Sequence, residues 1–401
     1  MSPIGPIGPI GPIGPIGPIP FSRRNFLATA ASGLAALWGL RGNNLLAADQ
    51  SPRIQTFRTL GRTGLKVSDV SLGTYGITQQ EVVQAALDSG VNFIDTGPSY
   101  SEAEVIVGRA LKQRKRDEVI VATRWYIKPN STATDILKQL DKSLGRLQTE
   151  YVDVIILGGA ESADQLKAPQ LHEAYAAALK AKKVRFSGVA SHGKQLMPIM
   201  HYAVESGQFD LIMPAYNFMQ SPGLEKEIAA AHTKGMAVMA MKTLGGARAA
   251  KVEGFGGSRT EQVRAAISWA LKDANVSSVV ITMKSFDDVK DCVGASGAKF
   301  GARESELLRR YAQACGDDYC RPGCSECCKN YAGPVRVQDI FRYQMYAGKY
   351  GLKGLAAQEY AALAAHERST NEALLAGLGE CPFGIDVKRK LAMADRMLWM
   401  A

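Results

Sequence analysis

The sequence of 401 residues lacks the Gly-x-Gly-x-x-Gly fingerprint that positions a dinucleotide pyrophosphate in Rossmann domains. A Rossmann domain is therefore not predicted. Charged residues make up only 21% of the chain and hydrophobic residues 46%, which is the balance of a protein with a folded core. The length leaves room for one large domain or two ordinary ones.

Aromatic residues do not interleave with the basic ones, although the chain carries a net charge of +10. Lysine and arginine instead occur in short groups along the chain, such as Lys180 to Arg185. Proteins that hold single-stranded nucleic acid combine a basic groove with aromatic side chains on which the bases stack. The pattern therefore indicates a solvated, mildly basic surface and no nucleic-acid partner.

The apolar stretch from Ala28 to Leu40 falls short of the roughly 20 residues that span a bilayer. It follows Ser22-Arg23-Arg24-Asn25-Phe26-Leu27 and precedes Leu46-Ala47-Ala48. This order resembles a twin-arginine export signal with a small-residue cleavage site. We therefore expect residues 21–48 to be a signal peptide that makes transient contact with the twin-arginine export machinery. The mature protein is then expected to begin near Asp49 and to be periplasmic.

Residues 1–20 precede this signal as a low-complexity tail, in which Pro-Ile-Gly repeats from Pro3 to Pro20. Glycine at every third position is also the pattern of collagen, but the run is too short for a stable triple helix. The prediction is a tail that builds no packed core.

Strand-like and helix-like segments alternate through the rest of the chain. The segments between the apolar runs, such as 80–89, 134–147 and 261–272, carry apolar residues at three-to-four spacing. Strands that are apolar on both faces favour a parallel sheet. Eight strand–helix units in about 250 residues match a closed (β/α)₈ barrel, although the spacing alone also allows an open sheet wound on both faces. The apolar runs begin at Val70, Val91, Val119, Val152, Phe186, Leu211, Ala237 and Ser278.

Several motifs resemble the aldo/keto reductase family. From Arg58 to Leu65 the chain reads Arg-Thr-Leu-Gly-Arg-Thr-Gly-Leu, a β-hairpin pattern similar to the opening of that family. The resemblance covers roughly 57–311 and implies an α/β fold, a (β/α)₈ TIM barrel over 54–312 with an N-terminal β-hairpin. The other motifs are Asp95 to Tyr100, Ser143 to Leu147, Gly188 to His192, Tyr216-Asn217 and Ile281 to Ser285.

The resemblance implies an active site at the carboxyl ends of the strands. In the family a tyrosine, here Tyr100, donates a proton to a carbonyl, and an aspartate, here Asp95, supports a lysine and a histidine. Arg124 stands in the place of the lysine and Gly158 in that of the histidine. A tyrosine has a pKa near 10, so it acts as an acid at neutral pH only beside a cation that stabilises the phenolate.

Arg124 keeps the positive charge but is planar and does not lose its proton, so it is not equivalent to lysine. We expect it to pair with Asp95 through two parallel hydrogen bonds and expect little reduction of simple aldehydes. His192 either stands in for the missing partners or occupies the position of a small polar residue that contacts nicotinamide. The catalytic candidates are Asp95, Tyr100, Arg124 and His192, with the alternative that Asp95 and Tyr100 are structural remnants.

The resemblance also implies NADP as the cofactor, with Ser191, Asn217, Lys284 and Ser285 as candidate binding residues. Lys284 and Ser285 follow the last strand, where the family binds the adenylate phosphate, and lysine suits a phosphate as a point charge. A plain surface lysine is the alternative. Relatives often carry a glutamine and an aromatic residue around the nicotinamide. Methionines stand at both positions here, which indicates weaker binding of the cofactor. These methionines are Met213 and Met241.

Six of the seven cysteines lie in the last quarter of the chain. Cys320, Cys324 and Cys327 form a triplet, and Cys381 is followed by Pro382. With the helix-rich stretch between them, they resemble the ferredoxin-like tail of some exported aldo/keto reductases. Residues 313–401 are therefore predicted to form a small helical domain. Two-cluster ferredoxins have two sets of four cysteine ligands, of which only one set is present here. The resemblance therefore implies one [4Fe–4S] cluster on those four cysteines.

Alternatives for the cysteines are disulfides in an oxidising compartment and a structural zinc site. Cys328 is either a spare or a substitute for Cys381 as the fourth ligand. Together, these predictions describe an exported NADP-dependent oxidoreductase with one iron–sulfur cluster, a small-molecule carbonyl or redox substrate and an electron-transfer partner. The alternative function is a catalytically lapsed barrel that serves as a cofactor-binding or redox-partner module.

Overall fold

The computed structural model describes residues 51–128, 130–219, 223–245, 257–316, 319–349, 351–368 and 370–399. The chain divides into two compact units, Met1–Gln50 and Ser51–Ala401. The first unit holds the predicted tail and signal peptide, which lie outside the described residues. In the second, none of the described helices is both long and apolar enough to cross a membrane.

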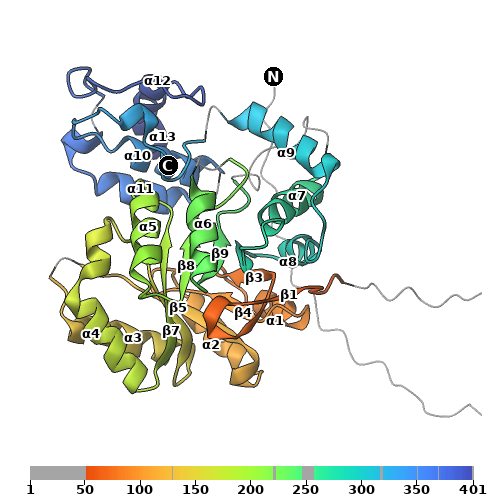
Figure 1. Ribbon diagram of the computed structural model, residues 1–401. Coiled ribbons are helices and arrows are strands. Elements are labelled where there is room, and N and C mark those ends of the chain that lie inside the picture. The colour runs from red at the N-terminus through yellow and green to blue at the C-terminus, as the bar shows by residue number, and fades with distance from the viewer. Residues whose placement is uncertain are drawn as a thin grey trace, which may run out of the picture. The chain divides into compact units, whose positions relative to one another are not determined.

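Eight parallel strands close into a barrel, in which β10 joins β3 and completes the ring (Figure 1). The closed (β/α)₈ barrel predicted from the sequence is therefore confirmed, and each strand begins within two residues of its predicted start. The strands are β3 (Val70–Gly73), β4 (Phe93–Asp95), β5 (Ile120–Trp125), β6 (Val152–Leu157), β7 (Val184–Ser191), β8 (Leu211–Pro214), β9 (Ala237–Met241) and β10 (Ser278–Thr282).

Helices connect successive strands, as a parallel sheet requires. The α-helices are α1 (Gln80–Asp88), α2 (Ala103–Leu111), α3 (Ala133–Leu147), α4 (Pro169–Lys180), α5 (Leu196–Ser206), α6 (Leu224–Thr233), α7 (Arg259–Leu271) and α8 (Phe286–Val293). Short 3-10 turns are η2 (Arg116–Glu118) and η3 (Ala163–Lys167). Helix α3 begins with a capping box between Thr132 and Asp135, which satisfies the first free backbone N–H groups of the helix.

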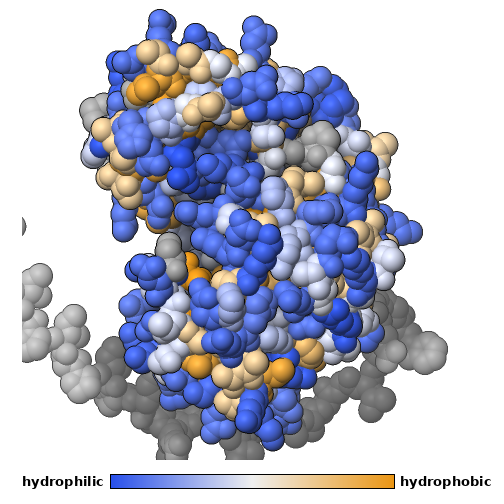
Figure 2. Space-filling view, turned by 60° about the vertical axis from the view of Figure 1, so that its left-hand side comes forward, coloured by the Kyte–Doolittle hydropathy of each residue, from blue (hydrophilic) through white to orange (hydrophobic). Residues whose placement is uncertain are grey.

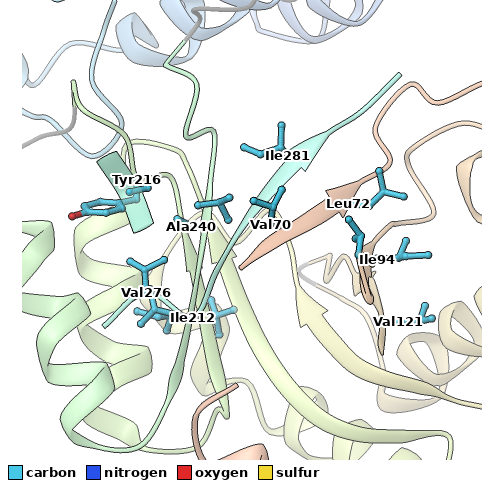
Figure 3. Packing of buried hydrophobic residues seen from close by; sticks show 14 of the residues in the cluster. Val70, Leu72, Ile94, Val121, Ile212, Tyr216, Ala240, Val276 and Ile281 are labelled. Carbon is cyan, nitrogen blue, oxygen red and sulfur yellow. The ribbon is translucent and has the colours of Figure 1, made fainter. Parts of the chain in front are cut away.

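Alternation along the strands separates two layers of apolar side chains. Ile94 and Val121 belong to the layer under the helices (Figure 3), whereas Phe93 and Ala122 fill the barrel interior. A two-stranded antiparallel hairpin, β1 (Phe57–Thr59) and β2 (Lys66–Ser68) with η1 (Gly61–Thr63) between them, contributes further side chains to that interior. The predicted N-terminal hairpin is thus confirmed.

A third cluster of apolar side chains forms in the C-terminal region and includes Ile340, Phe341, Tyr360 and Leu398. The predicted helical C-terminal region is present, and its helices gather together in Figure 1. The boundary predicted at 312/313 falls within α9 (Ala302–Cys315) and remains a prediction. The later elements are η4 (Glu326–Cys328), α10 (Val337–Lys349), α11 (Lys353–Ala361), η5 (Ala365–Arg368), α12 (Val387–Ala392) and α13 (Ala394–Leu398).

Candidate active site

The carboxyl ends of the strands bring most of the predicted site residues to one cavity of about 1000 Å³. Asp95 is the last residue of β4, Arg124 lies near the end of β5, and His192 follows β7. Tyr100 comes from the loop after β4, and Lys284 from the segment after β10. All five side chains line the cavity, as the barrel geometry led us to expect.

Asp95 and Arg124 form a buried ion pair at the cavity floor, with side-chain exposures of 6% each. One nitrogen, Nη2 of Arg124, donates to both carboxylate oxygens, at 2.9 Å to Oδ1 and 2.7 Å to Oδ2. The predicted pairing is thus present, but the two bonds share one nitrogen and are not parallel. Burial raises the pKa of Asp95 and Arg124 opposes this shift. The same Nη2 lies 3.5 Å from Sδ of Met213.

Tyr100 is partly buried, and its ring packs edge to face against Tyr75 with centroids 5.0 Å apart. The guanidinium carbon of Arg124 lies 5.6 Å from the centroid of the Tyr100 ring. Burial raises the pKa of Tyr100 well above its ordinary value, and Arg124 only partly offsets this effect. The phenol therefore holds its proton more tightly than a free tyrosine does, which makes it a weak acid for catalysis at neutral pH.

Tyr126 fills the space beside Gly158 and is a site residue that the sequence reasoning missed. A Cβ atom at Gly158 would lie 3.2 Å from Cε1 of Tyr126 and 3.4 Å from Cδ of Arg124. The hydroxyl of Tyr126 shares a hydrogen bond of 2.8 Å with Oγ of Ser99. A histidine at this position would therefore push against the Tyr126 ring. The sequence could have indicated Tyr126 as a site residue, because it lies two positions after Arg124 and residues two apart at a strand end point to the same side.

His192 is partly buried, and its Nδ1 atom is buried without a hydrogen-bond partner. Burial, together with the cations Lys242, Arg342 and Arg124, lowers the pKa of His192 well below its ordinary value. The imidazole is thus neutral at neutral pH. It can donate or accept a hydrogen bond there, but it holds no extra proton to deliver.

The predicted cofactor residues divide into two groups. Ser191 and Lys284 line the cavity, and so does Met241. Asn217 and Ser285 are not among the residues that line it, and their role at the cofactor stays a prediction. Asn217 is fully buried, and its amide donates to the carbonyl of Lys242 at 3.2 Å and to the hydroxyl of Tyr319 at 3.0 Å.

The side-chain oxygen of Asn217 also accepts from the N–H of Met219 at 2.9 Å, so the amide is occupied by the protein itself. Ser285 caps α8 by accepting from the N–H of Asp288 at 3.1 Å. Asp288 in turn accepts from the N–H of Lys284 at 2.7 Å and pairs with Arg259. Lys284 and Arg259 both line the cavity, and Arg259 pairs with Asp291 as well as with Asp288.

Three buried polar atoms around the cavity have no hydrogen-bond partner: Nε of Arg124, Nδ1 of His192 and Oγ1 of Thr243. Buried polar groups in folded proteins are nearly always hydrogen-bonded, so such a group of exceptions suits a site that binds a polar ligand. The cavity residues therefore fit the amide and ribose of a nicotinamide cofactor or a carbonyl substrate.

The C-terminal helix α10 contributes Asp339, Arg342, Tyr343 and Tyr346 to the same cavity. Figure 2 shows a hollow with mainly hydrophilic walls below the C-terminal helices. These residues were not predicted as site residues. The sequence shows that these residues are three or four positions apart and so share one face of a helix. It does not show that this face of the helix contacts the barrel.

The cysteine segment folds so that residues far apart in the sequence come together. The N–H of Gly379, two residues before Cys381, donates to the carbonyl of Cys327 at 2.8 Å. Arg321 lies over the ring of Phe383, at 3.4 Å from its centroid. Burial, followed by the thiols of Cys327, Cys324 and Cys381, raises the pKa of Cys320 to about 12. The Cys381 segment and the cysteine triplet therefore lie in the same region of the fold.

The five cysteines of the C-terminal region whose side chains are described are free thiols: Cys320, Cys324, Cys327, Cys328 and Cys381. Sγ of Cys328 lies 3.7 Å from Sγ of Cys327. Within the described ranges, no three His, Cys, Asp or Glu side chains are placed to hold a single metal ion. Cysteine thiols are the donor type of a [4Fe–4S] cluster, but their placement does not show such a site, so the cluster stays a prediction.

A closed barrel with a polar cavity at the carboxyl ends of its strands is the architecture of a barrel enzyme. The model of the aldo/keto reductase family matches residues 72–264. Over 224 residues the chain is 30% identical to 6-dehydroglucose reductase from Novosphingobium aromaticivorans, covering 50% of this chain and 72% of that protein. The chain belongs to the aldo/keto reductase family, which implies a nicotinamide cofactor and small carbonyl substrates.

Other relatives match over shorter lengths or share the fold alone. The aldo-keto reductase YhdN of Bacillus subtilis is 35% identical over 119 residues, and the match spans 24% of this chain and 36% of the relative. A solved aldo-keto reductase from Bacillus halodurans, in its holo form, superposes with a TM-score of 0.52. It is 22% identical and covers 64% of this chain and 96% of its own, which confirms the barrel.

Replacing Asp95 by asparagine should destabilise the fold by about 3–5 kcal/mol, because it leaves the charge of Arg124 buried without its counterion. The double variant Asp95→Asn/Arg124→Met should recover much of this loss. Urea unfolding of both proteins measures the free energies. As a control, Asp88→Asn removes the partner of Arg114 at an exposed position and should cost less than about 1 kcal/mol. Wild-type stability in Asp95→Asn would contradict the role of Asp95 as the counterion of Arg124.

Proposed function

We propose that this protein is an exported NADP-dependent oxidoreductase of the aldo/keto reductase type, with an altered carbonyl site and one [4Fe–4S] cluster. The observation that carries the proposal is the single cavity around Asp95, Tyr100, Arg124 and His192, with its partnerless buried polar atoms. NADPH, when bound, supplies the hydride. Ser191, Met241 and Lys284 are the cavity residues that would hold it, and Lys284 would attract its phosphate.

The chain's own contribution is to orient a carbonyl and to move a proton to its oxygen. Tyr100 is the donor, and Arg124 lies at its ring to stabilise the phenolate that forms. Because the pKa of Tyr100 is raised and Arg124 is held by Asp95, this transfer is unfavourable at neutral pH. His192 can position the carbonyl oxygen through a ring nitrogen, without supplying the proton.

The same features favour a second candidate function, a lapsed barrel that binds a nicotinamide cofactor or a redox partner without turning over carbonyls. The observation in its favour is the Tyr126 ring, which lies against Gly158, the position where the family has its histidine. The two candidates share cofactor binding and differ in turnover. A measurement of both therefore separates them.

Restoring the family's acid–base set should raise kcat/KM for simple aldehydes by about 10²-fold or more, since a positioned acid–base partner is worth that much in rate. The variant is Arg124→Lys/Gly158→His/Tyr126→Ala, in which the third change makes room for the imidazole. NADPH oxidation over a panel of aldehydes is the assay, and NADPH binding by fluorescence is measured alongside.

The matched control, Arg124→Lys/Gly158→His with Tyr126 kept, should gain less, because the ring crowds the new side chain. Robust wild-type turnover that depends on Tyr100 would refute the lapsed-barrel alternative. Wild-type protein that binds no NADPH would overturn the proposed function itself.

The proposed cluster rests on Cys320, Cys324, Cys327 and Cys381. Its support is the backbone hydrogen bond from Gly379 to Cys327, which fixes the Cys381 segment beside the triplet. A bound cluster would supply one-electron chemistry, for which the electron-transfer partner is proposed. Cys328 is adjacent to Cys327 and is proposed as the spare thiol.

In protein purified anaerobically, Cys381→Ser should abolish or weaken the visible absorption of the cluster and lower its iron and sulfide content. Cys328→Ser, the matched control one position from a proposed ligand, should keep both. A colourless wild type that contains no iron would end this part of the proposal. Loss of the chromophore in Cys328→Ser alone would make Cys328 the fourth ligand in place of Cys381.

Periplasmic localisation is proposed from Arg23-Arg24 and the apolar stretch that follows them. The twin-arginine route carries folded proteins, which suits a protein that receives its cofactors in the cytoplasm. Arg23→Lys/Arg24→Lys should remove the mature protein from the periplasmic fraction, while Arg53→Lys, beyond the signal, should not. Equal periplasmic yield from the double-lysine variant would refute export by this route.

A further inference from the structure

The ring of Tyr126 lies across two glycines at the carboxyl end of the barrel. Tyr126 directly follows β5, and Gly158 and Gly159 directly follow β6. A Cβ atom at Gly158 would lie 3.2 Å from Cε1 and 3.5 Å from Cζ of the ring. A Cβ atom at Gly159, where φ is +66°, would lie 3.3 Å from Cδ1. Two residues without side chains thus leave the volume that the ring occupies, and all three residues line the cavity.

Gln139 of α3 fixes the backbone of Tyr126. Its Nε2 atom donates to the carbonyl of Tyr126 at 3.1 Å, and its Oε1 atom accepts from the N–H of Tyr126 at 3.3 Å. Both backbone polar groups of Tyr126 are thus paired with a single side chain, which fixes the position from which the ring extends. A side chain that is positioned in this way before a ligand arrives loses little conformational freedom on binding.

The hydroxyl of Tyr126 meets a second hydroxyl, which comes from the loop after β4. It shares a hydrogen bond of 2.8 Å with Oγ of Ser99, in which either oxygen can be the donor. Ser99 is exposed and lines the same cavity. Each hydroxyl has one proton to donate and two lone pairs. The bond between them uses one of the two protons, so the other proton is available to a ligand in the cavity.

The charges near this pair of hydroxyls are balanced within the protein. Arg124 is paired with Asp95. Burial lowers the pKa of Arg124, whereas Asp95, Tyr100 and Tyr126 raise it, which reflects the closeness of the Tyr126 hydroxyl to the guanidinium. Glu359 of α11 adds a further carboxylate to the cavity lining. Because Arg124 already has its counterion, the site calls for no anion, and a neutral hydrogen-bond acceptor suits the two hydroxyls.

We propose that the hydroxyl of Tyr126 binds the carbonyl oxygen of the substrate, while Ser99 donates its own proton to the phenol oxygen. A carbonyl oxygen is a neutral acceptor, and every substrate of a carbonyl reduction carries one. A hydroxyl that accepts one hydrogen bond becomes a better donor for the next, because hydrogen bonds in a chain polarise one another. The contact lies beside Gly158, the position where the family has its histidine.

This inference deepens the proposed function and rests on it, because it names a residue that touches the substrate in the same cavity. Tyr126 positions the carbonyl, whereas Tyr100 remains the proton donor. His192 is the other side chain that can meet the carbonyl oxygen from the cavity wall. The experiment separates Tyr126 from His192.

The test compares 4-chlorobenzaldehyde with 4-chlorotoluene, which has the same ring but no carbonyl oxygen. The mature protein is saturated with NADP⁺, which carries no hydride to transfer, so the aldehyde binds without reacting. Tyr126→Phe removes the hydroxyl and keeps the ring against Gly158 and Gly159. Equilibrium dialysis should show binding of the aldehyde weakened about fivefold, the worth of one hydrogen bond, and binding of 4-chlorotoluene changed by less than about twofold.

Infrared spectroscopy of aldehyde labelled with carbon-13 at the carbonyl reads the hydrogen bond directly. A hydrogen bond to the oxygen lowers the carbonyl stretching frequency, so Tyr126→Phe should move the band of the bound aldehyde to higher frequency. A purely structural role for Tyr126 would leave the band in place. The matched control is Tyr151→Phe, which removes a phenol hydroxyl just before β6, away from the cavity lining, and should change neither the band nor the affinities.

An unchanged band with unchanged aldehyde affinity in Tyr126→Phe overturns the inference, and so does a wild type that binds neither compound. A band that moves in His192→Gln but not in Tyr126→Phe assigns the contact to His192 and also overturns it. Ser99→Ala should weaken aldehyde binding less than Tyr126→Phe does, because the phenol keeps its own proton. A larger loss in Ser99→Ala would make Ser99 the donor and contradict the assignment to Tyr126.

Turnover is followed separately, as NADPH oxidation in the presence of 4-chlorobenzaldehyde. If the wild type does not reduce the aldehyde but its band and affinity depend on the Tyr126 hydroxyl, the catalytic part of the proposed function fails and this inference stands. If the wild type and Tyr126→Phe reduce the aldehyde with equal kcat and KM, the proposed function stands and this inference fails.

Discussion

The buried ion pair between Asp95 and Arg124 is the constraint on which the site depends. The register of β4 and β5, with Asp95 opposite Ala122, places the two side chains next to each other inside the mouth of the barrel. A guanidinium at this depth is tolerated only with a close counterion, because its desolvation would otherwise cost several kcal/mol. The carboxylate is therefore committed to Arg124. Unlike a lysine, this cation has no titratable proton in the usual pH range.

Aromatic side chains surround the ion pair between Asp95 and Arg124. Tyr126 occupies the volume beside Gly158, and Tyr75 packs against Tyr100, so aromatic rings cover the ion pair. Burial under these rings raises the pKa of Tyr100 and makes its proton harder to release. The side chains at the floor of the cavity are therefore better suited to position a substrate than to donate a proton to it. Further charged side chains of the cavity lining come from the segment after β9 and from α10.

The sequence predicted what depends on periodicity and on the order of the strands. Strands apolar on both faces indicated a parallel sheet, and the family resemblance implied that it closes into a barrel. The barrel in turn placed Asp95, Arg124 and His192 at one end. Side chains on loops and on other helices were not predictable in this way. Asn217 was expected at the cofactor but is turned into the protein by hydrogen bonds to Tyr319 and Lys242, which required knowledge of how the chain returns after α9.

The path of the chain after α9 brings the C-terminal region to the site. Tyr319 precedes the first cysteine of the triplet and holds Asn217 at the end of β8, while Tyr346 on α10 holds Lys242 at the end of β9. Two phenols thus tie the C-terminal segment to neighbouring strand ends. The match with the family model ends at residue 264, so each contact joins a matched residue to a tyrosine that lies outside the match. The features that distinguish this chain from the matched part of the family therefore lie where the C-terminal region contacts the barrel. There, Arg342 and its neighbours on α10 line the same cavity as the residues of the barrel.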